Sequence, residues 1–242
     1  MADQYTAVIT GAAKGIGAEI ARNMLAQNYT VITIDIEPSQ ISHERLITIN
    51  TDLMDNDAVE KTAAQIAAGH KVTHLIHNAG LIWPNLLEDA KAEDITGLAQ
   101  LHLGSALTLA KAFLPAMKEK RFGRIIFNGS RAMLGVRTRT AYAATKAGIA
   151  GMARTWALEL AQHQITVNVV APGPVLTDNF WGIVPKDGEL QQKIANGIPV
   201  GRVGTVEDIA YAFMFFADPK SSFITGQTLY VCGGASIGIA VI

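Results

Sequence analysis

The chain has 242 residues, of which 49% are hydrophobic and 17% are charged, so it can form a packed globular core. Its formal net charge of -1 gives no overall field that would attract nucleic acid or an acidic membrane surface. No apolar run approaches the length of a membrane span, and residues 1–11 do not have the pattern of a secretory leader. The sequence has one cysteine, Cys232, so an intrachain disulfide is excluded. We therefore expect a cytoplasmic protein that binds neither nucleic acid nor membranes.

Short runs rich in β-branched residues recur along the chain, and each is a predicted strand. In chain order they span residues 5–10, 29–35, 45–52, 72–80, 124–130, 165–173 and 228–234. Most are separated by enough helix-forming sequence for a crossover helix, as in residues 17–28 and 56–68. The runs are almost continuously apolar, which is typical of a parallel sheet covered on both faces. The pattern predicts one α/β domain over residues 1–242, a doubly wound Rossmann-type parallel seven-stranded sheet with helices on both faces.

One segment interrupts this alternation. Residues from about 174 to 200 are rich in Gly and Pro, contain a short helical patch and are too long for an ordinary connection. We expect them to form a lid over the substrate. Within it, Asn179, Phe180 and Trp181 could close over a small polar substrate, and Trp181 is our candidate for substrate contact.

A glycine-rich segment, TGAAKGIG at residues 10–17, joins the first predicted strand to the first helix. Gly11, Gly15 and Gly17 allow a tight turn and let backbone N–H groups approach a pyrophosphate at the helix amino terminus. The spacing is not that of a Walker loop, which needs Gly-Lys followed by Ser or Thr. Between a strand and a helix, the segment predicts a dinucleotide site.

The second predicted strand ends at Asp35. An acid there can accept hydrogen bonds from both ribose hydroxyls of an adenosine and would repel a 2′-phosphate. Lys14, beside the glycine turn, has the opposite implication, because a cation there could bind a 2′-phosphate; it could equally be a solvated loop charge. We give Asp35 the greater weight and predict NAD, with NADP as the weaker alternative.

Three residues further along predict the chemistry. Tyr142 and Lys146 lie four residues apart on a predicted helix and so share one face. A lysine ammonium and a positively charged nicotinamide ring would both favour tyrosinate, moving the pKa of Tyr142 from about 10 toward the working range. Tyr142 could then accept an alcohol proton while hydride leaves for the ring. Ser130, at the end of the fifth strand, would hydrogen-bond the substrate oxygen.

TGAAKGIG, Asp35, HNAG at 77–80, Ser130, YAATK at 142–146 and PGPVLT at 172–177 together resemble the classical short-chain dehydrogenase/reductase family. The resemblance runs from about residue 5 to about residue 235, in the family's order. It implies a catalytic Ser130, Tyr142 and Lys146, and a homotetramer or dimer that pairs the Tyr142 helix between subunits. The resemblance and the motifs above place these residues around the cofactor: Gly11, Lys14, Gly15, Ile16, Gly17, Asp35, Ile36, Asp52, Leu53, Asn78, Ala79, Gly80, Tyr142, Lys146, Pro172, Gly173, Val175 and Thr177.

Two histidines depart from the family's pattern. In the family, an asparagine in the helix after the fourth strand anchors a water in the proton relay to the lysine; here LHLGS places His102 at that position. His102 could serve the relay, because a histidine binds water and exchanges protons, or it could pack against the sheet. His77 replaces another asparagine, which we interpret as a tolerated change. We predict no metal site at His70, His74 and His77, because residues 74 and 77 face opposite sides of a strand.

Three arginines lie between Ser130 and Tyr142. Arg131 begins the loop after the fifth strand and should line the substrate pocket, whereas Arg137 and Arg139 are more readily explained as solvated or ion-paired. A guanidinium recognises a carboxylate, sulfonate or phosphate at two points, so Arg131 indicates an anionic substrate.

We therefore predict an NAD-dependent oxidoreductase acting on a secondary alcohol or ketone that bears an anionic group. The alternatives are an NADPH-dependent reductase of 3-oxoacyl thioesters and a non-catalytic dinucleotide sensor or scaffold. The presence of Ser130, Tyr142 and Lys146 argues against the last of these.

Overall fold

Seven parallel strands form a single sheet in the order β3-β2-β1-β4-β5-β6-β7 in the computed structural model, which describes residues 5–182 and 188–237. Each coincides with one of the β-branched runs, β5 beginning one residue before its run, so the predicted strands and the parallel sheet are confirmed. The strands are β1 (Thr6–Thr10), β2 (Thr30–Asp35), β3 (Leu46–Asn50), β4 (His74–His77), β5 (Gly123–Asn128), β6 (Ile165–Pro172) and β7 (Thr228–Val231).

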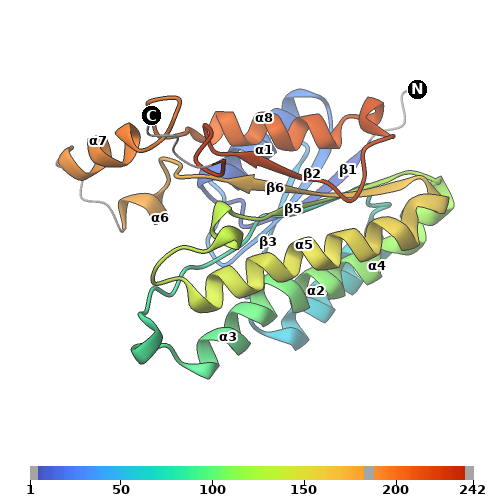
Figure 1. Ribbon diagram of the computed structural model, residues 1–242. Helices are drawn as coiled ribbons and strands as arrows, with labels where there is room; N and C mark the ends of the chain where they lie inside the picture. The colour runs from blue at the N-terminus through green and yellow to red at the C-terminus, as the bar shows by residue number, and fades with distance from the viewer. Residues whose placement is uncertain (1–4, 183–187, 238–242) are drawn as a thin grey trace.

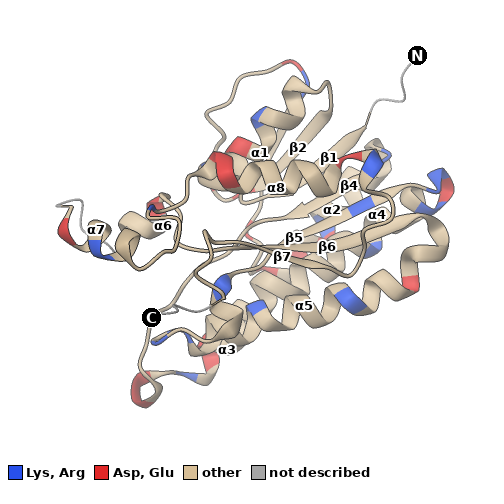
Figure 2. Ribbon diagram, turned by 45° about the horizontal axis from the view of Figure 1, so that its top comes forward, with Lys and Arg blue, Asp and Glu red and all other residues tan. Residues whose placement is uncertain are grey.

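Helices cover both faces of the sheet (Figure 1). One layer consists of α1 (Gly15–Ala26) and α8 (Val206–Ala217), and the other of α2 (Asn56–Gly69), α4 (Ser105–Lys120) and α5 (Thr140–Leu160). The alternation of side chains along each strand supplies both cores. In β1, for example, Val8 packs with α2 and α4, whereas Ala7 and Ile9 pack with α1 and α8. Acidic and basic residues occur on both helical layers (Figure 2).

The connection from β2 to β3 contains no helix, unlike the typical crossover between parallel strands. Residues 36–45 form a bend and a turn, and the two strands still pair in parallel, with Asp35 opposite Asn50. β3 is the first strand in the order of the sheet and so lies at its edge, where side chains such as that of Ile47 are partly exposed.

The order of the strands reverses between β1 and β4, where a doubly wound sheet forms a crevice at its carboxyl edge. Glycines let the chain pass closely through this point. Gly11 has a φ of +65°, and a Cβ on it would lie 2.7 Å from the Cα of Ala79. A Cβ on Gly17 would overlap the carbonyl oxygen of Gly11. Gly17 therefore allows α1 to pack tightly against the turn.

Two helices of the predicted lid, α6 (Asp178–Trp181) and α7 (Glu189–Asn196), lie at one end of the sheet, at the left of Figure 1. Residues 183–187 of this segment are outside the described residues. Ala195, Ile198 and Val203 form a small apolar cluster of their own there. Within the described residues, no helix has the length and hydropathy needed to cross a bilayer.

Candidate active site

A cavity of about 590 Å³ lies along the carboxyl edge of the sheet. Its wall includes nearly all the residues predicted for the site: Gly11, Lys14, Gly15, Ile16, Asp35, Ile36, Asp52, Leu53, Asn78, Ala79, Gly80, Ser130, Arg131, Tyr142, Lys146, Pro172, Gly173, Val175 and Thr177. Three predicted residues are not in this wall. Gly17 packs behind the glycine turn, His102 is fully buried, and Trp181 is replaced at the wall by Phe180. Adjacent residues of a helix point in different directions, so Trp181 instead packs edge-on against Phe180.

Hydrogen bonds fix the ends of three strands beside this cavity. The Thr10 hydroxyl accepts from the backbone N–H groups of Asn78 (3.0 Å) and Ala79 (3.1 Å). The Asn78 amide donates to the carbonyl of Gly11 (2.7 Å) and accepts from the Asn128 amide (2.9 Å). Asn78 thus connects β1, β4 and β5 and supports the glycine turn, while the adjoining Ala79 and Gly80 line the cavity.

The start of α1 fits a diphosphate. Lys14 occupies the N-cap position, and its side chain makes no capping hydrogen bond. The first N–H groups of the helix are therefore left for another acceptor, and a helix amino terminus favours an anion. Gly15, with a φ of +60°, lies at this point on the cavity wall.

Ser130, Tyr142 and Lys146 come together at the other end of the cavity. The Ser130 oxygen accepts from the N–H of Ala132 (3.0 Å), which leaves the hydroxyl proton of Ser130 free to be donated. The Lys146 ammonium is buried, donates to the carbonyl of Asn128 (2.6 Å) and lies 5.7 Å from the centre of the Tyr142 ring. The three side chains are held by β5 and the first turns of α5.

Burial dominates the electrostatics of this group. It lowers the pKa of Lys146 to about 7. It also raises the pKa of Tyr142 above its ordinary value, while a hydrogen bond from Ser130 and the charge of Arg139 act in the opposite direction. Within the protein alone, desolvation outweighs the charges near Tyr142; the expected lowering of its pKa by Lys146 and an oxidised nicotinamide ring together stays a prediction.

His102 lies in a π-helical turn, Gln100–Gly104, between α3 (Ala92–Ala99) and α4. Its Nδ1 is 2.9 Å from the Thr145 hydroxyl, which itself donates to the carbonyl of Ala141 (3.0 Å). The hydroxyl of Thr145 has one proton, which it gives to the carbonyl of Ala141, so it must accept a hydrogen bond from Nδ1–H of His102. In this tautomer Nε2 carries no proton and has a free lone pair. That buried Nε2 has no hydrogen-bond partner among the described residues.

The orphan nitrogen and the ammonium of Lys146 both lie beside Gly80. A Cβ on Gly80 would lie 3.0 Å from Nε2 of His102 and 3.2 Å from Nζ of Lys146, so both groups crowd the same glycine. Burial, followed by the charge of Lys146, lowers the pKa of His102 far below its ordinary value and keeps the ring neutral. His102 can therefore accept a hydrogen bond but does not carry a charge.

His77, the second departure from the family's pattern, helps to position the turn that carries His102. Thr10 already accepts two N–H bonds, so its proton goes to Nδ1 of His77 (3.1 Å). Nε2–H of His77 then donates to the carbonyl of Leu101 (3.1 Å), the residue before His102. His77 thus helps to hold the π turn, which is a more specific role than a tolerated change. On the opposite face, His74 bonds the carbonyl of Ala217.

Two of the three arginines line the cavity, Arg131 and Arg139, whereas Arg137 is exposed. Within the described residues, neither lining guanidinium has a carboxylate within ion-pair distance. Nη1 of Arg139 donates to the Thr138 hydroxyl (2.7 Å), and the carbonyl of Thr138 accepts from the N–H of Asn85 (3.1 Å). Arg139, expected from the sequence to be solvated or ion-paired, lies in the wall of the cavity.

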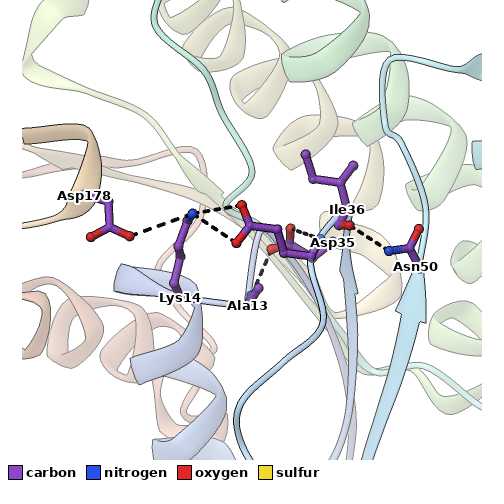
Figure 3. A network of polar contacts seen from close by, with 7 residues as sticks. Ala13, Lys14, Asp35, Ile36, Asn50 and Asp178 are labelled. Atoms are coloured by element: carbon purple, nitrogen blue, oxygen red, sulfur yellow. Dashed lines mark hydrogen bonds and ion pairs between the residues drawn. The ribbon is translucent and has the colours of Figure 1, made fainter. Parts of the chain in front are cut away.

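Acidic residues form the end of the cavity beside β2. Asp35, at the end of β2, accepts hydrogen bonds from the N–H groups of Ala13 (2.9 Å) and Glu37 (3.1 Å). Glu37, which the sequence analysis did not consider, also lines the cavity and pairs with Lys14. Its position two residues after Asp35 was the available signal. Figure 3 shows this network of contacts.

A dinucleotide turn at a sheet's switch point, with a serine, tyrosine and lysine group in the same cavity, defines a nicotinamide-dependent oxidoreductase. Comparison with known proteins makes the class specific. The profile of a family described as Enoyl-(Acyl carrier protein) reductase matches residues 11–236. The chain belongs to the short-chain dehydrogenase/reductase family, as its motifs predict, and is an oxidoreductase of that family.

Among curated proteins, the chain is 34% identical over 241 residues to the (2S)-[(R)-hydroxy(phenyl)methyl]succinyl-CoA dehydrogenase subunit BbsD of Thauera aromatica, covering 96% of each. It is 36% identical over 236 residues to the 3-oxoacyl-[acyl-carrier-protein] reductase FabG of Salmonella typhimurium, covering 94% of this chain and 96% of that protein.

Among solved structures, a short chain dehydrogenase family protein from Francisella tularensis matches with a TM-score of 0.90 at 29% identity, over 98% of this chain and 100% of that one. A protein provisionally described as an NAD(P) dependent gluconate 5-dehydrogenase, from Beutenbergia cavernae with bound NADP at low occupancy, matches with a TM-score of 0.88 at 30% identity, over 97% of each chain.

Proposed function

We propose that the protein transfers a hydride between NAD and a secondary alcohol or ketone that bears an anionic group. One observation carries the proposal: a single cavity holds Ser130, Tyr142 and Lys146 at one end and the Asp35 carboxylate at the other. The two ends match the reacting end and the adenosine end of a dinucleotide.

In this proposal, Ser130 donates a hydrogen bond to the substrate oxygen, and Tyr142 accepts the alcohol proton or returns it to the ketone. The bound cofactor supplies the hydride acceptor and, in its oxidised form, a positive charge. Burial raises the pKa of Tyr142, so the tyrosinate needs a stabilising positive charge close by. Lys146, held on the carbonyl of Asn128, is placed to provide such a charge whenever it is protonated.

We propose that Nε2 of His102 accepts a hydrogen bond, either from the ammonium of Lys146 or from a water between the two side chains. Its tautomer leaves Nε2 as an acceptor, and that atom and the lysine ammonium both lie against Gly80. A direct contact or an intervening water would then connect Lys146 to His102. A π turn in the middle of a helix is often associated with a functional site, which supports this role over simple packing.

The proposal for NAD rests on Asp35. Its two oxygens are fixed by the N–H groups of Ala13 and Glu37, and it lines the cavity where a ribose would lie. A carboxylate accepts from ribose hydroxyls but repels a phosphate, which favours NAD.

The relatives support a second candidate, an NADPH-dependent reductase of 3-oxoacyl thioesters. FabG of Salmonella typhimurium is named as a 3-oxoacyl-[acyl-carrier-protein] reductase, and the Beutenbergia structure holds NADP. At 36% and 30% identity, respectively, relatives can differ in cofactor and substrate through a few residues. The local charge at Asp35 is therefore our reason to place NAD first.

An anionic substrate is proposed from Arg131 and Arg139. Both line the cavity with Tyr142, and neither is paired with an acid among the described residues. Two of the similar proteins are named for compounds that contain an acid or an acyl thioester, the succinyl-CoA derivative and gluconate. A carboxylate on the substrate would satisfy such a guanidinium at two points.

Steady-state rates with NAD⁺ and NADP⁺ test the proposal against its rivals. The panel contains small 2- and 3-hydroxy acids, their neutral amides and a 3-hydroxyacyl thioester, and it is repeated with Asp35→Ala. We expect turnover of a hydroxy acid with NAD⁺, and a smaller preference for NAD⁺ in Asp35→Ala. Preference of the parent for NADP⁺ and the thioester would favour the second candidate. Tight binding of dinucleotide without turnover of any compound would favour a sensor or scaffold.

The proposed assembly is a homotetramer or a dimer, located in the cytoplasm. α5 presents the small residues Ala144, Ala147 and Gly151 together with Leu158, which is 84% exposed. Small residues allow another helix to approach closely, and symmetric oligomers are common.

A further inference from the structure

Glu37 forms an ion pair across the entrance to the adenosine end of the cavity. Nζ of Lys14 donates to both carboxylate oxygens of Glu37, at 2.9 and 3.1 Å. On its other side, the same ammonium lies 3.8 Å from the carboxylate of Asp178, the first residue of α6. Figure 3 shows the contact between Lys14 and Asp178.

The backbone that carries Glu37 is fixed rather than loose. The N–H of Glu37 donates to Asp35 (3.1 Å), and the side-chain amide of Asn50 donates to the carbonyl of Ile36 (2.7 Å). Ile36 itself is 60% exposed, so these bonds, and not burial, define the bend after β2. Glu37 is therefore held beside Asp35 at the wall of the cavity.

Charge at this end of the cavity is unfavourable for a phosphate. Among the described residues from 11 to 54 that line it, Lys14 is the only cation, whereas Asp35, Glu37 and Asp52 are acids. Lys14 is the one group that could bind a 2′-phosphate there, and both of its closest contacts are carboxylates.

The ion pair contributes little to folding. The side chains of Lys14 and Glu37 are 57% and 51% exposed, and pairs this open to solvent have a weak effect on stability. Glu37 also makes the largest contribution to raising the pKa of Lys14, so the lysine remains charged. The main effect of the pair between Lys14 and Glu37 is to make the lysine ammonium less available to other anions.

We propose that Glu37 is a second determinant of cofactor choice, acting by occupying Lys14 so that the lysine is not available to a 2′-phosphate. The inference rests on the proposed function, in which Asp35 is the first determinant. Asp35 excludes the phosphate by its own charge; Glu37 excludes it through a cation that would otherwise attract it.

A double-mutant cycle tests the inference, with dissociation constants for NADP⁺ and NAD⁺ measured by calorimetry at low salt. Glu37→Gln keeps the size of the side chain and removes its charge. We expect it to tighten NADP⁺ binding about tenfold, roughly the contribution of one charge-assisted hydrogen bond, with NAD⁺ changed less than about twofold. The gain should shrink at high salt, because the sites are exposed. Adding Lys14→Gln should abolish most of the gain.

The control is Glu44→Gln, which removes an exposed acid before β3, at the opposite edge of the sheet from the cavity. It should change neither affinity. A Glu37→Gln protein that binds NADP⁺ within twofold of the parent would overturn the inference. A gain that survives Lys14→Gln would also overturn it, since Glu37 would then act only by its own charge. The test compares the dissociation constant of each variant with that of the parent, so it does not depend on which cofactor the parent prefers. The NAD assignment is tested separately by Asp35→Ala, and its failure is therefore distinguished from failure of this inference.

Discussion

Lys146 should make the protein less stable at neutral pH than at alkaline pH, and Lys146→Met should remove that dependence. The lysine is buried, and burial lowers its pKa to about 7, against 10.5 for an ordinary lysine. Below pH 7 the ammonium is charged in both the folded and the unfolded chain, so the full cost of burying it is present. As the pH rises from 7 to 10.5, the folded chain loses this proton first and the cost is relieved.

The size of the effect follows from these two pKa values. Between pH 7 and pH 9 the folded chain gains about 2 kcal/mol relative to the unfolded chain, because each unit contributes about 1.4 kcal/mol once the folded lysine is neutral. For a chain of this length, that corresponds to a rise in Tm of roughly 4 to 8 °C. Methionine has a similar length and no charge, but it leaves the carbonyl of Asn128 without its hydrogen bond, at a cost of about 1–3 kcal/mol that does not vary with pH.

The assay is thermal unfolding without added nucleotide at several pH values from 6.5 to 9, for the parent and Lys146→Met. The difference in Tm between them should change steadily with pH in favour of the parent. Lys111→Met, on the exposed side of α4, is the matched control and should follow the parent. Parallel curves for the parent and Lys146→Met would show that Lys146 is an ordinary lysine whose pKa is not lowered by burial.

Three further predictions concern the cavity and the assembly. His102→Ala should lower kcat several-fold and also lower Tm, because it empties a buried site, whereas His102→Asn, which restores a polar acceptor, should recover most of the rate; a fall in Tm with kcat unchanged would indicate packing alone. Arg139→Met and Arg131→Met should each raise KM for a hydroxy acid about tenfold or more and spare its neutral amide, whereas Arg137→Met, which changes an exposed residue, should affect neither. Equal losses for the acid and the amide would contradict an anion site. Light scattering at micromolar concentration should give a tetramer or a dimer, and a monomer would rule out the proposed use of α5.

The sequence predicted the sheet because seven separate β-branched runs repeat one local pattern, and it predicted the glycine turn because few residues other than glycine fit such close contacts. It did not predict the helix-free connection after β2, where residues 36–45 have no periodic pattern to read. Nor could it place Arg139 at the cavity wall, because that position depends on the bond between Thr138 and Asn85.

The balance of charges around Tyr142 and Lys14 could not be predicted from the sequence, for a related reason. Spacing along a helix places Lys146 beside Tyr142, but the sign of a pKa shift depends on how much solvent both groups lose. The pairing of Glu37 with Lys14 joins residues 23 positions apart, so it emerges only once β2 and the glycine turn lie side by side.

The tautomer of His102 likewise required the fold. It follows from the number of hydrogen bonds that Thr145 makes, which no motif contains. The sequence placed His102 at the position of a relay residue, and the structure added that its free nitrogen is an acceptor.

A single-turnover experiment tests the proposal that Tyr142 moves the proton while hydride passes between cofactor and substrate. Parent and Tyr142→Phe are mixed with NADH carrying deuterium at the hydride-donating carbon and with a keto acid that the parent reduces. Nucleotide affinity is measured alongside. We expect deuterium on the product carbinol with the parent. With Tyr142→Phe we expect NADH affinity within about twofold of the parent and a transfer rate lowered by at least a hundredfold, the usual contribution of a general acid. Transfer by Tyr142→Phe at more than about a tenth of the parent's rate would contradict the proposal.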